Sequence, residues 1–379
     1  MTPSIRAAQA ANFGRFVAAP AAALLAGAIC LLAAFPFPAS PAAEDKPAFV
    51  MEEYCSTFAF APDNRIAIGV YRVYNHKKYT LEGDDLWIAS TDGKRTRIIE
   101  GAKLVKVDKP QSFKINEITW SPDSQKLAIF KTTEHLAGDK DTLTSGDLTE
   151  LLDTAGREIT IQGVKENPLI GGYQATWLAD GSTVAFLTEV VKPRELVEIH
   201  TVNVTTGQAL KLFDPHQFIS VVWDAAHNRA IAIERDKGMS GPAKLVSLDL
   251  LHDTRKEIAD LESAQGQLSI SPSGKRVAFF YDGDVLEVRD LAAPSKFIHV
   301  RVGLGKYEWA PDERHILLKR GPESRSGNLM WVSIPDGNFT TAMNDLVYRD
   351  FHYSPDGRFI GLLRVTRNLA IYPSSAFTP

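Results

Sequence analysis

The sequence predicts an all-β protein, a seven-bladed β-propeller of four-stranded antiparallel blades, and three observations lead to this fold. An eleven-residue motif occurs seven times, with starts 39 to 60 residues apart. Strand-like segments follow the copies, and the repeats contain no amphipathic segment with the 3.6-residue period of a helix. Repeats of this length fit a four-stranded unit with connections of variable length.

The motif has the pattern of a strand, a tight turn and a second strand. A large, mostly aromatic residue ends the first strand, and the turn residues are suitable because Pro fixes φ while Asp or Gly tolerates turn geometry. The Val, Ile, Ala and Phe run that follows is typical of a strand buried on both faces. The copies are FAPDNRIAIGV at 60, WSPDSQKLAIF at 120, WLADGSTVAFL at 177, WDAAHNRAIAI at 223, ISPSGKRVAFF at 270, WAPDERHILLK at 309 and YSPDGRFIGLL at 353.

Two further strands complete each repeat. Third strands are predicted at 85–93, 196–207, 244–250, 285–291 and 328–337, and fourth strands at 95–101 and 210–215. A β-sandwich is the competing all-β fold, but it would not need a fixed motif at the start of each unit. The WD dipeptide at Trp223 and Asp224 ends a first strand, not a third, and is interpreted as coincidental.

The last repeat stops at Pro379 before a fourth strand. The segment KPAFVMEEY at 46–54 has strand character and precedes the first repeat. An N-terminal strand in the last blade would close the ring and remove two exposed sheet edges. The sequence therefore predicts a ring closed by this strand.

Residues 1–42 have the pattern of a secretory signal. Arg6 and Arg15 are the charged residues, an apolar run extends from Phe16 to about Phe37, and Ser40 and Ala42 fit a cleavage site after position 42. We expect a signal peptide at 1–42 and a propeller at 43–379, in the periplasm or secreted. The alternative is an uncleaved anchor, which would be the protein's contact with the membrane.

Length and composition describe a globular protein that is long enough for one large domain or two small ones. The chain has 379 residues, of which 44% are hydrophobic and 23% charged. Loss of two arginines with the signal would change the formal charge from −4 to −6, which does not favour nucleic acid. Cys55 would then be the single cysteine and could form no intrachain disulfide, and we expect a monomer.

The motifs WSPDSQKLAIF, ISPSGKRVAFF and YSPDGRFIGLL, with DLWIASTDG at 85–93, resemble the TolB-like (WD40-like, SPDG-repeat) β-propeller family over residues 55–373. Seven copies, and no room for an N-terminal α/β domain, distinguish the chain from TolB itself. The resemblance implies the propeller fold and a periplasmic protein that binds partner proteins at the cell envelope. Similar propellers also precede the hydrolase domain of prolyl-oligopeptidase-type peptidases, which is not expected here.

No catalytic motif is recognisable. G-x-S-x-G, H-E-x-x-H and C-x-x-C are absent from the sequence, so we expect no enzyme activity, no cofactor and no metal. The nine histidines are scattered, although a propeller can gather ligands from several blades. Asp139 and Asp141 start like a calcium loop, but Leu143 and the lack of a final Glu favour a solvated loop.

Connections between second and third strands are long and should all lie on one face of the propeller. They span 72–84, 131–147, 189–196, 235–243 and 319–327, with acidic and basic residues about equally represented, which suits a protein better than nucleic acid. Residues expected to contact a partner are Tyr74, His76, Lys77, Tyr79, His135, Asp139, Asp141, Lys192, Arg194, Met239, Lys319, Arg320 and Arg325.

The sequence thus predicts an exported, non-catalytic propeller that binds a protein partner at the cell envelope through this face. The alternative is a propeller enzyme, or a binder of a small molecule or metal, with its site in the central channel.

Overall fold

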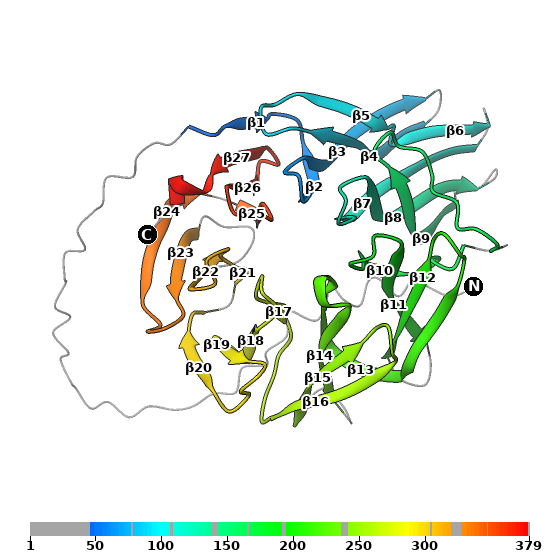
Figure 1. Cartoon of the computed structure of the whole chain (residues 1–379). Coiled ribbons are helices and arrows are strands. Elements are labelled where there is room, and N and C mark those ends of the chain that lie inside the picture. Colours follow the sequence, from blue (N-terminus) through cyan, green and yellow to red (C-terminus); the bar gives the residue numbers. More distant parts are fainter. Residues whose placement is uncertain are drawn as a thin grey trace, which may run out of the picture. The chain divides into compact units, whose positions relative to one another are not determined.

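The computed structural model of the chain is a seven-bladed β-propeller, in which antiparallel sheets follow one another around a ring (Figure 1). It confirms the predicted fold class, and the described helical segments are the short 3₁₀ turns η3 (Ala225–His227) and η4 (Ser374–Phe377). The structure describes residues 46–76, 79–106, 109–137, 142–164, 167–191, 195–235, 242–303, 305–319, 327–346 and 348–377, all within the compact unit 43–379.

Strands are assigned to blades in chain order. Blade 1 contains β2 (Cys55–Phe60), β3 (Ile66–His76), β4 (Tyr79–Ala89) and β5 (Arg95–Ile99). Blade 2 contains β6 (Ala102–Lys106), β7 (Lys109–Trp120), β8 (Lys126–Ala137) and β9 (Thr142–Asp153). Blades 3 and 4 comprise β10 (Tyr173–Trp177), β11 (Thr183–Val191), β12 (Glu195–Asn203), β13 (Ala209–Asp224), β14 (Arg229–Arg235), β15 (Ala243–Asp249) and β16 (Thr254–Leu261).

The remaining blades are regular. Blade 5 contains β17 (Ser269–Ile270), β18 (Arg276–Asp282), β19 (Val285–Asp290) and β20 (Phe297–Arg301). Blade 6 contains β21 (Tyr307–Trp309), β22 (His315–Lys319), β23 (Gly327–Ser333) and β24 (Phe339–Leu346). Blade 7 contains β25 (Tyr348–Tyr353), β26 (Phe359–Arg364), β27 (Leu369–Pro373) and the N-terminal β1 (Phe49–Met51).

Two blades depart from the predicted pattern. Strand β13 is continuous, so its first half is the outer strand of blade 3 and its second half the inner strand of blade 4. In blade 2 the sheet is extended by β6, which pairs with the start of β7, while the outer side of β9 carries an isolated bridge between Leu152 and Glu158.

The N-terminal strand lies beside the last strand of the chain. Phe49, Val50 and Met51 pair with Ile371, Ala370 and Leu369. Met51 is fully buried, in a cluster that also contains Cys55 and Phe58 of blade 1 and Leu369 of blade 7. The predicted strand therefore occupies the fourth position of blade 7; that it closes the ring energetically stays a prediction, for which a truncation is the test.

The repeated motif joins neighbouring blades. Its turn places one residue in the left-handed region in every copy, namely Asn64, Ser124, Gly181, Asn228, Gly274, Glu313 and Gly357. In four copies the carbonyl of this residue accepts a hydrogen bond from the basic residue that follows the turn of the preceding blade, as Gly181 does from Lys126 at 2.6 Å and Gly274 from Arg229 at 2.7 Å.

Three of these four basic residues also pack on aromatic rings of the next blade. The cations of Arg65, Lys126 and Arg276 lie 5.4, 5.3 and 5.3 Å from the ring centroids of Trp120, Trp177 and Trp309. A cation over a tryptophan face is attracted by its quadrupole. The large residue and the basic residue of the motif thus act together across blade boundaries.

The propeller has two faces, distinguished by their connections. The motif face carries the turns between first and second strands, and the hairpin face carries the connections between second and third strands together with those that link blades. Antiparallel order places alternate turns of each blade on the same side. Among the described residues no helix is long and apolar enough to cross a membrane.

Candidate functional site

Several of the predicted long connections on the hairpin face are extended β-hairpins. Pairing in blade 1 continues to His76 opposite Tyr79, and in blade 2 to Ala137 opposite Thr142. These segments were expected to be loops, but strand pairing satisfies their backbone groups far beyond the body of the blade. The face therefore presents ordered strand pairs as well as connections.

The predicted contact residues are placed as follows. Tyr74 is half-buried on β3, and His76, Tyr79 and His135 lie on β3, β4 and β8, with side chains outside the described set. Lys319 ends β22 with 2% exposure, so its side chain belongs to the interior and not to the expected surface. Lys77, Asp139, Asp141, Lys192, Arg194, Met239, Arg320 and Arg325 lie outside the described residues.

The hydroxyl of Tyr74 forms hydrogen bonds inside blade 1. It donates to Asp85 Oδ1, while the Gly101 N–H donates to Asp85 Oδ1 at 2.9 Å and to the Tyr74 oxygen at 3.1 Å. Burial, followed by the hydrogen bond to Asp85, raises the pKa of Tyr74. Tyr74 consequently stabilises the β3–β4 hairpin, and its polar end is not available to a partner.

A different group of residues forms an exposed aromatic surface on this face. We define the tyrosine patch as Tyr54, Tyr71, Val73, Val365 and Arg367. The rings of Tyr54 and Tyr71 lie 4.9 Å apart, and the Arg367 guanidinium lies 4.5 Å from the Tyr54 ring centroid. Tyr54, Val73 and Val365 are 42, 53 and 38% exposed.

The backbone holds the patch in one arrangement. The Tyr71 N–H donates to the Tyr54 carbonyl at 2.7 Å, and the Cys55 N–H donates to the Arg367 carbonyl at 2.7 Å. Tyr71 and Val73 lie two residues apart on β3, so their side chains share one side of the strand. The patch therefore connects blades 1 and 7 at the point where the ends of the propeller meet.

The patch was not predicted from the sequence, although one signal for it existed. Side chains alternate along a strand, which places Tyr71 and Val73 together and Tyr74 on the other side. Tyr74 was predicted to contact a partner on the basis of residue type alone. Tyr54 and Arg367 come from opposite ends of the chain, and their proximity follows from the pairing of β1 with β27.

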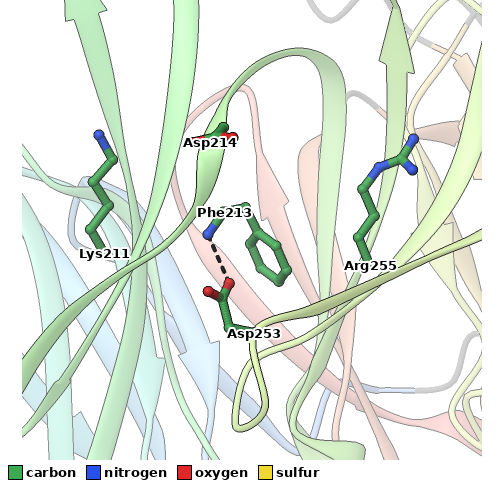
Figure 2. Close-up of a pocket in the computed structure, with 5 residues that line it drawn as sticks. All are labelled: Lys211, Phe213, Asp214, Asp253 and Arg255. Carbon is green, nitrogen blue, oxygen red and sulfur yellow. Dashed lines mark hydrogen bonds between the residues drawn. The ribbon is translucent and has the colours of Figure 1, made fainter.

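A polar cavity of about 510 Å³ lies between blades 3 and 4 (Figure 2). Its residues are Lys211, Phe213, Asp214, Asp253 and Arg255, and the Phe213 N–H donates to Asp253 Oδ1 at 2.9 Å. Lys211 is paired with Glu198, and Arg255 with Glu234 and Glu257, both at 3.1 Å. Because both cations have acidic partners, this cavity has no clear preference for a charged ligand.

A second cavity, of about 290 Å³, lies at the inner strands of blades 4, 5 and 6. We call it the channel-mouth cavity, and its principal residues are Trp223, Asp224, Ser269, Ser271, Glu308 and Trp309. Asp224 is 6% exposed and accepts hydrogen bonds from Arg229 Nε at 2.7 Å and from the ring of His227, also at 2.7 Å.

Glu308 belongs to a group of ionisable side chains from blades 6 and 7 that lie close to one another. Glu308 Oε1 accepts a hydrogen bond from the Tyr353 N–H at 3.0 Å, and Glu308 Oε2 lies 3.1 Å from His352 Nδ1. Lys306 Nζ contacts Asp350 and lies 3.4 Å from His352 Nε2. Burial, and then the charge of Lys306, lower the pKa of His352.

Within the described residues no group of three or more His, Cys, Asp or Glu side chains is arranged to hold a metal ion. Cys55 is free and buried, and burial raises the pKa of its thiol to about 12. A thiol with so high a pKa is a poor nucleophile at neutral pH.

Comparisons with known proteins identify the fold. No protein-family model and no curated protein sequence matches the chain. Similar solved structures are numerous, 1096 chains in all. One belongs to the crystal structure of the mitotic checkpoint complex, with 13% identity and a TM-score of 0.53 over 95% of this chain and 99% of that chain.

A second similar structure is the β-propeller domain of Cps50 (Swd1) from Myceliophteria thermophila. It has 11% identity and a TM-score of 0.56, over 87% of this chain and 99% of that chain. Likeness at this identity concerns the fold alone. The chain is therefore a β-propeller, and its resemblance to the TolB-like family stays a prediction.

Proposed function

We propose that this protein is an exported, non-catalytic propeller that binds a protein partner at the cell envelope through the tyrosine patch. The observation that carries the proposal is the contact between the tilted rings of Tyr54 and Tyr71, with the Arg367 guanidinium over the Tyr54 ring, held by backbone hydrogen bonds between blades 1 and 7. Tyrosine and arginine are enriched among the residues that dominate binding energy in protein interfaces.

The chemistry of the patch indicates the kind of partner. Tyr54, Val73 and Val365 offer apolar area, and Arg367 is the cation within the patch. Arg72 and Arg95 lie 6.0 and 5.5 Å from the ring centroid of Trp87, but they already have acidic partners in Asp85 and Glu53, which leaves Arg367 as the cation for a partner. A partner surface with apolar side chains around a carboxylate would complement this arrangement.

Export rests on the sequence pattern of residues 1–42 alone. N-terminal sequencing of the protein recovered from the envelope fraction should begin at Ala43 if the signal is cleaved there. Recovery of the intact N-terminus in the membrane would favour the uncleaved anchor, and recovery with cytosolic proteins would contradict export.

The binding proposal is tested by capture from the native envelope. Full-length protein with a C-terminal tag should retain one stoichiometric partner, and the double variant Tyr54→Ala, Arg367→Ala should lose it. Leu251→Ala is the matched control, because Leu251 is 56% exposed but follows a third strand on the motif face. Equal capture by all three proteins would exclude the tyrosine patch as the interface.

The second candidate function is binding of a small molecule in the central channel. The channel-mouth cavity favours it, because this cavity lies among inner strands and contains two carboxylates and two indole rings. The two functions use opposite faces of the propeller and can coexist.

A further inference from the structure

Trp223 is an exception among the tryptophans that end first strands. Trp120, Trp177 and Trp309 are 7, 1 and 3% exposed, and each has a cation of the preceding blade near its ring. Trp223 is half-buried, and within the described part of the chain no cation lies over its ring. Its indole N–H donates to the Gln174 carbonyl at 2.5 Å, which fixes the ring.

The missing cation has a cause in the sequence. In the preceding blade, the residue after the turn is Thr183, whose carbonyl accepts the Leu178 N–H at 2.8 Å. The carbonyls of Lys126 and Arg276 close their own turns in the same way, so Thr183 occupies the position of the basic residue. Its hydroxyl donates to Asp180 Oδ2 at 2.7 Å and does not extend to the next blade.

The cavity beside Trp223 has acidic character. Of the described residues that form it, Asp224 and Glu308 are acidic and none is lysine or arginine. The charge of Asp224 is balanced by Arg229, whose Nε lies 2.7 Å from Asp224 Oδ2. Among the described residues, the ion-pair neighbour of Glu308 is the imidazole of His352, whose Nδ1 lies 3.1 Å from Glu308 Oε2.

The protonation state of His352 determines whether this side chain neutralises the negative charge of Glu308. Groups around this histidine include Lys306, Asp350 and Glu308, with the ring of Phe58 at 5.2 Å. Burial and Lys306 lower the pKa of His352, whereas Glu308 raises it by a smaller amount. A neutral imidazole can donate one hydrogen bond to Glu308 but leaves its negative charge in place.

We propose that the channel-mouth cavity binds an organic cation, a primary amine or guanidinium, with Glu308 as its counter-ion and Trp223 as its aromatic wall. The ligand would supply to Trp223 the kind of contact that Arg276 supplies to Trp309 within the protein. Ser269 also lines the cavity and offers a hydroxyl group for a remaining N–H donor, whereas the buried Ser271 hydroxyl accepts a hydrogen bond from the Arg276 N–H at 3.1 Å. A volume of about 290 Å³ suits an arginine- or lysine-sized group, at the small end of ligand pockets.

Titration calorimetry of the exported protein tests this with a matched pair of probes. N-acetyl-arginine amide and N-acetyl-citrulline amide have nearly the same shape, but only the first is charged. We expect binding of the arginine probe and at least about tenfold weaker binding of the citrulline probe. Equal binding of both probes, or binding of neither, would overturn the proposal.

Two variants locate the site. Glu308→Gln keeps an acceptor for the Tyr353 N–H, and Trp223→Leu removes the aromatic ring. Each substitution should weaken binding of the arginine probe about tenfold. Asp282→Asn, an exposed carboxylate at the end of β18, should leave the affinity unchanged. Unaltered affinity in both Glu308→Gln and Trp223→Leu, with melting temperatures near wild type, would place the binding elsewhere and refute the assignment.

A third probe distinguishes the source of the cation. N-acetyl-Gly-Arg-Gly amide places the guanidinium on a peptide, as a protein partner would. Tighter binding of this peptide than of the single residue indicates a partner's side chain, and weaker binding indicates a free amine. Loss of the envelope partner in the tyrosine-patch variant without loss of the arginine probe would show that the two sites are separate.

Discussion

The guanidinium of Arg276 lies 5.3 Å from the centroid of the Trp309 ring, and its Nη2 donates to the Glu313 carbonyl of the same neighbouring blade. A basic residue of one motif thus contacts both the aromatic residue and the turn of the next. The repetition of the motif therefore has a physical role, because it brings a basic residue into contact with the turn of the next blade at four of the blade boundaries.

Removal of this contact should destabilise the propeller. Arg276→Ala loses the packing on Trp309 and the hydrogen bond to Glu313, so the free energy of unfolding should fall by about 1–3 kcal/mol. Urea denaturation measures the change. Lys94→Ala is the control, since the Lys94 side chain is 87% exposed and should change stability by less than about 0.5 kcal/mol. A similar small effect of Arg276→Ala would contradict the role assigned to the motif.

Asp356 links the turn of blade 7 to blade 1 and should respond to pH. Burial would raise its pKa, but hydrogen bonds from Arg358, Ser354 and Asn64 outweigh burial and hold the pKa of Asp356 well below its usual range. A depressed pKa stabilises the fold above the unfolded value of about 3.9, and this stabilisation is lost as the pH falls through the folded value.

Melting temperatures of wild type and Asp356→Asn should therefore differ most near pH 7 and converge below about pH 4. Asn64→Gly measures the contribution of the 2.7 Å hydrogen bond from Asn64 of blade 1 to Asp356 of blade 7. Glycine removes the side chain but still adopts the left-handed backbone conformation at φ 67°. A constant difference between wild type and Asp356→Asn from pH 3 to 7 would be inconsistent with the assigned role of the carboxylate.

The pH dependence of stability caused by Asp84 should be opposite to that caused by Asp356. It is 2% exposed, and burial raises its pKa despite the hydrogen bond from the Ile115 N–H of blade 2 at 2.8 Å. A raised pKa favours the protonated form, so the stabilisation is present at low pH and is lost as the pH rises through the folded value. Asp84→Asn should raise the melting temperature at pH 7 by about 2 °C, with no gain at pH 4.

The N-terminal strand should stabilise the whole domain. A chain that starts at residue 52 lacks β1 but keeps Tyr54, and it should melt in one transition at a lower temperature than a chain that starts at 43. Met51→Ala should cost about 2–5 kcal/mol because this side chain is fully buried. An unchanged melting curve for the shortened chain would mean that pairing with β27 is not needed to close the ring.

Much of the fold follows from local sequence patterns. The seven motifs predicted the inner strands, and Trp223 and Asp224 do end the inner strand β13. The fourth copy of the motif lacks proline, yet it forms an equivalent turn. Asn228, which follows η3, adopts the left-handed backbone conformation that Gly181 and Gly274 adopt in other copies. Turn geometry can be inferred from sequence because it depends on a few adjacent residues.

The candidate sites depend on contacts between distant segments and were not predictable in the same way. Tyr54 meets Arg367 because the two ends of the chain pair in blade 7. Lys319 was expected on the surface by its charge, but its position at the end of the buried strand β22 places it inside. Glu308 and Trp223 come from different blades, and no spacing in the sequence relates them.

The central claim is that the tyrosine patch is the surface that binds a protein. The most direct measurement is the dissociation constant of the captured envelope partner for wild type, Tyr54→Ala, Arg367→Ala and Leu251→Ala, by calorimetry. We expect each patch variant to weaken binding by about tenfold or more, with melting temperatures near wild type, and Leu251→Ala to bind like wild type. Unchanged affinity in both patch variants would contradict the account and move the interface away from blades 1 and 7.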